Sequence, residues 1–326
     1  MQTVFIIFGI LEGKKCDMLT TTIVMTMYNG TKYVLEQLDS LRSQTHQPEK
    51  VIISDDGSSD SSVELVEDYI KRYDLGGSWI CRQNVKNLGY ADNFWYAARE
   101  VDTDVFFFCD QDDVWKENKI ETMLKVFEEN EQVQVLGSGY TAFTDTGESY
   151  KDIALTQVSE TGELEKVNLN YKTIFIGCEG CTMAVRTAFL EEIAPYHYDC
   201  APHDEFVWKS ALCVDGCYIL HESLMMRRFH ANNVTHNKMH DKKTRIKFLE
   251  LLLRSHIVMK QIALEHSVGK QELRIIDKNI ESVKLRIDLL KRKKLENAII
   301  LAIKYHNCYH SKKAILMEEI IAIKKE

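Results

Sequence analysis

Three carboxylates stand within four positions at the end of an apolar run in this chain. The run covers residues 105–109, and the carboxylates belong to Asp110, Asp112 and Asp113. A short, β-prone run without charge predicts a strand that is buried on both faces. Crowded carboxylates repel one another, but they suit a hard cation that shares its oxygen ligands with phosphates. The segment therefore predicts a cation site for a diphosphate, and its alternative is a solvated acidic turn before the next helix.

Other polar side chains follow the β-prone segments that precede this run. Tyr28, the pair Asp55 and Asp56, and Asn87 each come shortly after such a segment, and helical periodicity lies between the segments. Strands that alternate with helices predict an α/β fold with a doubly wound, mainly parallel sheet. Ligands bind such sheets beyond the carboxyl ends of the strands. We therefore expect these side chains to gather at one edge of the sheet.

The expected elements follow from the same periodicities. Strands are predicted at residues 20–27, 51–54, 79–82, 105–109 and 133–144, and helices at residues 33–43, 63–72, 92–100, 116–130, 187–193 and 206–212. Residues 150–170 are polar and loop-like, and from about residue 244 the pattern is almost entirely helical. The chain is expected to divide into an N-terminal extension or edge strand (1–18), an α/β domain (19–240) and a basic helical tail (241–326).

The charge of the chain is unevenly distributed. The formal net charge is −8, yet residues 241–326 contain 20 Lys and Arg against 11 Asp and Glu, and the remainder contains 21 against 38. An acidic body argues against a nucleic-acid partner. The basic, amphipathic tail is compatible with peripheral contact at a membrane surface, with a helical hairpin that makes a homodimer, or with a solvated face over a core.

The cysteines and the N-terminal segment indicate the cellular compartment in which the protein is expected. The nine cysteines show no disulfide scaffold pattern and read as reduced core thiols of a cytoplasmic protein. Cys178 and Cys181 form a C-x-x-C pair, but no second pair follows at zinc spacing. The apolar run at residues 4–11 is shorter than the roughly 20 residues of a membrane span and lacks a cleavage signal. We expect a cytoplasmic protein whose tail reaches the inner face of the cell membrane if it binds lipid.

The order of these motifs resembles the family 2 glycosyltransferases of GT-A fold over roughly residues 19–236. The motifs that carry the resemblance are Tyr28-Asn29, the Ser-Asp-Asp-Gly-Ser-Ser-Asp segment at 54–60, Asn87-x-Gly89-x3-Asn93, Asp110-Gln-Asp-Asp-Val-Trp115, Gly180-Cys-Thr-Met183, His203-Asp204 and Arg228-Phe-His230-x2-Asn233. The last four are similar to the rhamnosyltransferase-like branch. The chain departs from that branch at residues 227–229 and 205–206, and these departures concern the sugar preference more than the reaction.

The resemblance implies an inverting, metal-dependent transfer of sugar from a nucleotide-diphospho sugar. It implies that Asp204 is the base that takes the proton of the acceptor hydroxyl. The alternative role of Asp204 is the N-cap of a helix that begins near Phe206. Asp112 is implied as the ligand of Mn²⁺ or Mg²⁺, and His230 as a second ligand or a phosphate contact. Asp110 is implied to contact the ribose or the sugar, or to reach the metal through water.

The donor-binding set implied by the resemblance also includes residues of the loops after the first three predicted strands. Asp55 would accept a hydrogen bond from a pyrimidine imide, with Asp56 supporting the turn, and Tyr28 would stack on the base; a plain Asp-Gly turn is the alternative for Asp55. Asn87 belongs to the same set. Arg228 would meet the diphosphate, and the alternatives for Arg228 and His230 are a solvated arginine and a surface histidine.

Three residues are expected to support the site without contacting the substrate. Asp113 is expected to orient the acidic loop or to cap the helix behind it, and Trp115 to pack and fix that loop. His203 is expected to orient Asp204.

The implied donor is dTDP-rhamnose in the first place, followed by UDP-sugars and other dTDP-sugars. The acceptor would be a saccharide or a lipid-linked molecule in polysaccharide or glycolipid assembly, and the helical tail could cover its site. One alternative is a nucleotidyltransferase, but residues 28–31 are not the basic, glycine-rich loop expected for a triphosphate. The other alternative is a non-catalytic nucleotide- or carbohydrate-binding module, against which Asp112 and Asp204 argue.

Overall fold

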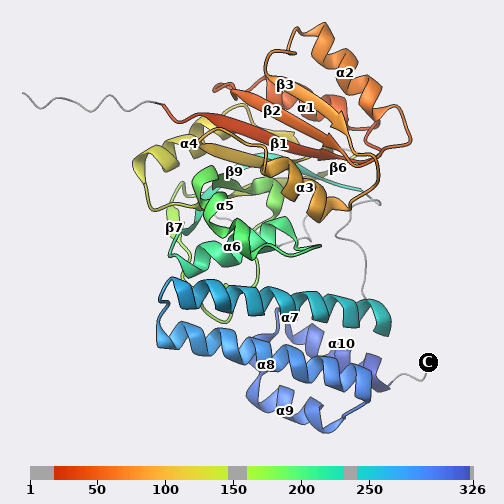
Figure 1. Ribbon diagram of the computed structural model, residues 1–326, viewed down its shortest axis with the longest axis vertical. Coiled ribbons are helices and arrows are strands. Elements are labelled where there is room, and N and C mark those ends of the chain that lie inside the picture. The colour runs from red at the N-terminus through yellow and green to blue at the C-terminus, as the bar shows by residue number, and fades with distance from the viewer. Residues whose placement is uncertain (1–17, 146–159, 231–240, 324–326) are drawn as a thin grey trace, which may run out of the picture.

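The computed structural model describes residues 18–145, 160–230 and 241–323 (Figure 1). The predicted N-terminal extension therefore lies outside the described residues apart from Met18, and so does much of the polar segment 150–170. Figure 1 shows a twisted sheet with helices on both faces and a further layer of helices beneath it. The described strands are β1 (Thr21–Met27), β2 (Lys50–Asp55), β3 (Trp79–Gln83), β4 (Val105–Asp110), β5 (Val114–Trp115), β6 (Val135–Thr144), β7 (Leu164–Lys166), β8 (Ala184–Arg186) and β9 (Cys217–Phe229).

The sheet has the order β3-β2-β1-β4-β8-β6-β9-β5, and β7 pairs with β9. The first four strands in this order are parallel to one another, and so are the long strands β6 and β9. The short strand β8 runs antiparallel between β4 and β6, and β5 and β7 run antiparallel to β9. The predicted α/β fold with a mainly parallel sheet is therefore confirmed, and its second half is mixed.

The helices are α1 (Val34–Arg42), α2 (Ser62–Arg72), α3 (Tyr90–Ala98), α4 (Lys119–Glu129), α5 (Thr187–Ile193), α6 (His203–Cys213), α7 (Lys242–Glu265), α8 (Lys270–Arg292), α9 (Glu296–Lys304) and α10 (Lys312–Ile323). The apolar run of β4 explains how they are divided between the two faces. Phe106 and Phe108 pack with α3, α5 and α6, whereas Phe107 packs with α1, α2 and α4. Alternate residues of a strand point to opposite faces, so a central strand needs apolar residues at every position.

Several elements differ from the prediction. The short strands β5, β7 and β8 were not predicted, and β7 lies within the segment 150–170 that was expected to be loop-like. The sequence did not indicate β9, because His221, Glu222 and Ser223 interrupt its apolar pattern and its pairing with β6 contains irregularities. Helix α6 begins at His203, three residues before the predicted start at Phe206, and Pro202 occupies the N-cap position. Proline fixes the backbone angle just before the first turn and gives up no helical hydrogen bond there.

The C-terminal helices are docked on the α/β region. Val258 and Met259 of α7 and Ile276 of α8 belong to the same buried cluster as Phe206 and Trp208 of α6. Helices α9 and α10 in turn pack on α8. The predicted helical character after residue 244 is confirmed, and the predicted boundary near residue 240 falls in residues 231–240, outside the described chain.

A buried ion network joins α7, α8 and α10. The Glu318 carboxylate accepts two hydrogen bonds from Arg286, at 2.8 and 2.6 Å, and one from Nε of Arg245 at 2.8 Å. Removal of one partner from a buried ion pair leaves an uncompensated charge. The substitution Glu318→Gln should therefore lower the free energy of unfolding by about 3–5 kcal/mol, as measured by urea denaturation.

The matched control is Glu250→Gln, which removes a half-exposed carboxylate that pairs with Lys291. It should change the free energy of unfolding by about 0–1 kcal/mol. Equal unfolding midpoints for the two variants would show that the Glu318 network does not hold these helices together.

Candidate functional site

The acidic loop after β4 is tied to the loop after β1. The backbone N–H of Tyr28 donates to Oε1 of Gln111 (2.9 Å), and Nε2 of Gln111 donates to the Tyr28 carbonyl (3.1 Å). A Cβ atom at Gly30 would lie 2.3 Å from Oε1 of Gln111, so only glycine permits this approach. The two loops therefore meet at one edge of the sheet, as predicted, and half-exposed Tyr28 lies at this edge.

The carboxylates of Asp55, the last residue of β2, and of Asp56 hold the turn that follows the strand. Oδ2 of Asp55 accepts hydrogen bonds from the backbone N–H groups of Gly57 (3.1 Å) and Ser58 (2.8 Å), and Asp55 is fully buried. The Asp56 carboxylate accepts hydrogen bonds from two backbone N–H groups of the loop after β3. In the same loop, the Asn87 side chain donates to the Asp56 carbonyl (3.0 Å). This geometry supports the turn-forming alternative for Asp55, and its predicted contact with a pyrimidine stays a prediction.

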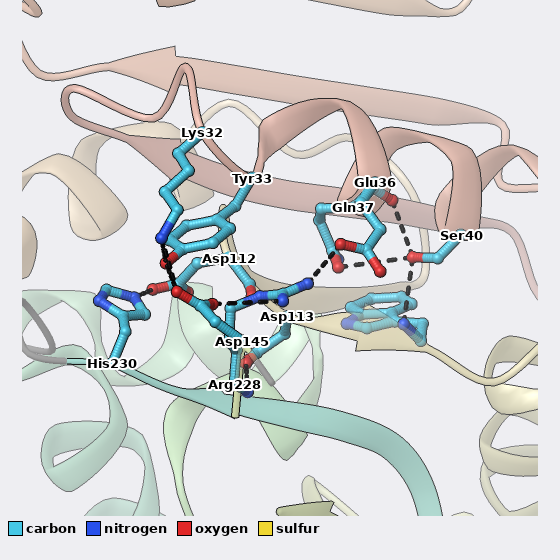
Figure 2. Close-up of polar contacts among 11 residues, drawn as sticks. Lys32, Tyr33, Glu36, Gln37, Ser40, Asp112, Asp113, Asp145, Arg228 and His230 are labelled. Carbon is cyan, nitrogen blue, oxygen red and sulfur yellow. Dashed lines mark hydrogen bonds and ion pairs between the residues drawn. The ribbon is translucent and has the colours of Figure 1, made fainter. Parts of the chain in front are cut away.

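Asp112 and His230 come together from distant parts of the chain. Nε2 of His230 lies 2.7 Å from Oδ2 of Asp112, and the ring of Tyr33 lies 4.9 Å from the imidazole, centroid to centroid (Figure 2). Both side chains of the pair are largely buried. The structure therefore places the two predicted metal ligands next to each other.

Arg228 lies behind the acidic loop and joins three elements (Figure 2). Its Nε donates to the Asp112 carbonyl at 2.9 Å, and its guanidinium forms ion pairs with Glu36 of α1 and with Asp145 after β6. It also lies 4.6 Å from the ring centroid of Tyr33. The side chain is buried, so these contacts give Arg228 a role in holding the loop. Its predicted contact with a diphosphate stays a prediction.

Asp113 and Trp115 support the loop from within the core. Oδ1 of Asp113 accepts a hydrogen bond from the backbone N–H of Arg228 at 2.9 Å. The helix behind the loop has Asn118 at its N-cap, so the helix-capping alternative for Asp113 is wrong. Trp115 is buried, and the ammonium of buried Lys119 lies 3.9 Å from its ring centroid.

The acidic loop offers a donor set that fits a divalent cation. Ligand atoms of Asp110, Asp113 and Cys181 lie within 4.8 Å of one another, and Oδ2 of Asp113 is buried without a hydrogen-bond partner. Burial, with the neighbouring Asp112 charge, raises the pKa of both Asp110 and Asp113, so a cation would relieve this crowding. Burial also raises the pKa of the Cys181 thiol well above its ordinary value, which makes the thiol a poor ligand.

Carboxylate oxygens and one imidazole nitrogen are donors that suit Mn²⁺ or Mg²⁺. The residues around the loop therefore fit the implied metal. Cys178, the other member of the C-x-x-C pair, packs against Gly137 and is not part of this donor group. All the described cysteines are free thiols.

Asp204 lies in the first turn of α6, beside the acidic loop. Because Pro202 is the N-cap residue, the alternative of a helix-capping role for Asp204 is wrong. Its Oδ1 accepts a hydrogen bond from the backbone N–H of Glu205 at 2.7 Å. Burial raises the pKa of Asp204 to about 7, and the charges of Glu205 and Asp110 act in the same direction. The two predicted acidic motifs therefore share one electrostatic environment.

His203 is a core residue. Its ring packs between Phe94 and Phe108, with centroid distances of 4.0 and 4.5 Å, and neither ring nitrogen has a hydrogen-bond partner. Burial lowers the pKa of His203 to about 3, so the ring is neutral. The histidine therefore fixes the start of α6 by packing and makes no hydrogen bond to Asp204, and its expected role in orienting Asp204 stays a prediction.

Two buried charge pairs near the site were not anticipated. Arg227 donates to Glu179 at 2.8 Å, and its charge lowers the pKa values of Asp110 and Asp113 against the effect of burial. On α6, Lys209 pairs with Glu205, which also accepts from Ser255 of α7 at 2.8 Å. No pattern of spacing distinguishes these charges from surface ones in the sequence. The only sign in the sequence that these charged residues are buried is their position inside otherwise apolar segments.

Comparison with known proteins agrees with this arrangement. Residues 22–192, more than half of the chain, match the profile described as "Glycosyl transferase family 2". The chain belongs to glycosyl transferase family 2. It is 23% identical over 216 residues to an uncharacterized glycosyltransferase of Rickettsia typhi, which covers 66% of this chain and 65% of that protein. The teichoic acid poly(glycerol phosphate) polymerase of Staphylococcus epidermidis is 29% identical over 169 residues, covering 52% of this chain and 22% of the polymerase.

The chain spans about two thirds of the length of the first of these relatives, at 65%. Among solved structures, S. aureus TarS 1-349 in complex with UDP aligns with a TM-score of 0.61 at 16% identity, covering 93% of this chain and 90% of that one. The mannosyltransferase PcManGT of Pyrobaculum calidifontis, in complex with GDP-Man and Mn²⁺, aligns with a TM-score of 0.51 at 12% identity, covering 93% and 86%. At these identities the likeness establishes the fold, which is of GT-A type.

The close packing of Gly180 against α6 can be tested directly. A Cβ atom at Gly180 would lie 2.6 Å from Nε2 of His203 and 3.2 Å from Cβ of Asp204, and the histidine ring is held between two phenylalanines. Gly180→Ala should therefore lower the free energy of unfolding by about 1–3 kcal/mol, measured by urea denaturation.

The control for this overpacking is Gly76→Ala, where a Cβ atom would meet nothing within 4 Å. That variant should stay within about 0.5 kcal/mol of the parent protein. A Gly180→Ala protein as stable as the Gly76→Ala protein would mean that the start of α6 is not fixed by this contact.

Proposed function

We propose that this protein is an inverting glycosyltransferase that moves a sugar from a nucleotide-diphospho sugar to a saccharide or lipid-linked acceptor. The observation that carries the proposal is the position of Asp204, a partly buried carboxyl group with a pKa of about 7 that senses the charge of the acidic loop. An unperturbed aspartate, with a pKa of about 3.9, is too weak a base to take a hydroxyl proton efficiently near neutral pH. Because burial raises the pKa of Asp204, its carboxylate is a stronger base than an ordinary aspartate, and it is still ionised in part near neutral pH.

The acidic loop supports the other half of the reaction, the departure of the nucleoside diphosphate. Asp112 and His230, with Asp110, would hold Mn²⁺ or Mg²⁺, which supplies positive charge for the diphosphate when bound. Arg228 and Asp113 keep the loop in place through the contacts described above. In this proposal the base lies on α6, and the loop that would bind the diphosphate through the metal follows β4.

The donor we propose is a pyrimidine nucleotide sugar. Two observations support different candidates: the acidic loop resembles the rhamnosyltransferase-like branch, and the structurally similar TarS was solved with UDP and with UDP-GlcNAc. We therefore propose dTDP-rhamnose and UDP-N-acetylglucosamine as the donors to compare, with GDP-mannose as the purine control. Half-exposed Tyr28 is the side chain proposed to stack on the base.

The proposed setting is the assembly of a surface polysaccharide or teichoic acid. It is supported by relatives that include the polymerase described above and the hyaluronan synthase of Streptococcus pyogenes, which is 29% identical over 131 residues. That alignment covers 40% of this chain and 31% of the synthase. We place the reaction at the inner face of the cell membrane, where lipid-linked acceptors would be presented.

The experiment that tests the function measures release of nucleoside diphosphate from each donor in the presence of Mn²⁺. Asp204→Asn should lower the rate of nucleoside diphosphate release at least about 100-fold, because an amide cannot take the proton of the acceptor hydroxyl. Donor binding, followed by the thermal shift of the protein, should be retained because Asp204 lies on α6 and not on the acidic loop.

The matched control is Asp199→Asn, which alters an exposed carboxylate five residues earlier and should leave the rate unchanged. Full release by Asp204→Asn would disprove the assignment of the base. A protein that binds donors yet never releases diphosphate, even with acceptors supplied, would instead be the non-catalytic binding module.

A further inference from the structure

Helix α9 is apolar on two opposite sides. Leu301 faces inward and is buried in the cluster that joins α7, α8 and α10. Leu295, Ile299 and Ile303 are 54%, 66% and 69% exposed. Residues four apart lie on one face of a helix, so these three side chains form one outward line along α9 and the residue before it.

Such a face requires a partner. A surface helix ordinarily presents polar side chains to water, and apolar residues all round indicate a helix that is buried on both sides. Helix α9 lies at the end of the molecule farthest from the sheet (Figure 1), where no described element covers its outer side. A contiguous exposed apolar patch marks an interaction site.

The charges around the line indicate the kind of partner. Lys291, Arg292 and Lys293 are exposed directly before it, and exposed Lys304 ends α9. Residues 241–326 carry nine more basic than acidic residues, whereas the rest of the chain carries 17 more acidic than basic residues. An anionic surface would therefore attract this end of the molecule and repel the end that holds the acidic loop.

We propose that the α9 face, defined as Leu295, Ile299 and Ile303 with the basic residues 291–293 and Lys304, binds the surface of an anionic lipid bilayer. The aliphatic side chains enter the boundary between headgroups and acyl chains, and the basic side chains meet the lipid headgroups. Within the described ranges, no helix is long and apolar enough to cross a bilayer, so the contact is one of lying on the surface. The proposal does not depend on the proposed function.

The test uses the full chain and flotation with vesicles of phosphatidylcholine, with and without phosphatidylglycerol. Binding should require phosphatidylglycerol and should weaken as salt is raised. The variant I299Q/I303Q should lower the partition coefficient at least about tenfold, because two buried aliphatic side chains are lost. The variant K291Q/R292Q/K293Q should also lower it at least about tenfold.

The control variant I80Q/V85Q removes two exposed apolar side chains from the acidic body and should bind vesicles like the parent protein. Circular dichroism and the release of nucleoside diphosphate should be unchanged in all the variants, which separates this proposal from the proposed function.

Three results would overturn the proposal. One is equal vesicle binding by the parent protein and I299Q/I303Q, and another is equal binding to vesicles with and without phosphatidylglycerol. The third is a parent protein that ignores vesicles but is a dimer that I299Q/I303Q converts to a monomer in sedimentation velocity. That result would assign the α9 face to a second copy of the chain.

Discussion

The structure depends on the crowding of carboxylates at a poorly hydrated edge of the sheet. Asp110 ends the central strand β4, Asp112 and Asp113 follow it, and Asp204 lies on α6. Burial makes ionisation of Asp110, Asp113 and Asp204 unfavourable, and the charges of neighbouring carboxylates add to this effect. The pKa of Asp204 is raised to about 7 by this environment, chiefly by burial. The same environment that would otherwise destabilise the fold thus gives Asp204 the pKa that the proposed base would need at neutral pH.

The surrounding elements hold this unfavourable arrangement in place. Arg228 binds the acidic loop to α1 and to the end of β6, and Gln111 binds it to the loop after β1. On the opposite side, His203 fixes the start of α6 by packing, and the Glu205 pair with Lys209 joins α6 to α7 through Ser255. The C-terminal helices therefore contribute to the position of α6, which carries the proposed base Asp204.

The sequence predicted the parts of the fold that depend on simple patterns. Strands β1 to β4 lie within one or two residues of their predicted positions, because buried apolar runs end at polar turns there. The long strand β9 was missed, because polar residues at 221–223 break its pattern where the pairing is irregular. The sequence led to the prediction that Asp112, His230 and Asp204 carry the chemistry, and these roles stay predictions. Only the structure shows Asp55 closed within its own turn. Arg227 and Glu179 could not be found from spacing, since a buried ion pair has no periodic signature.

The central claim is that burial gives Asp204 the pKa of a base that works near neutral pH. The most direct measurement is the pH dependence of kcat/KM for sugar transfer, which reports the pKa of the essential base in the free enzyme. Because the base must be ionised to accept a proton, kcat/KM should fall as the pH is lowered through about 7. A profile that stays flat down to about pH 5 and falls only near 4, the ordinary range of aspartate, would contradict the account.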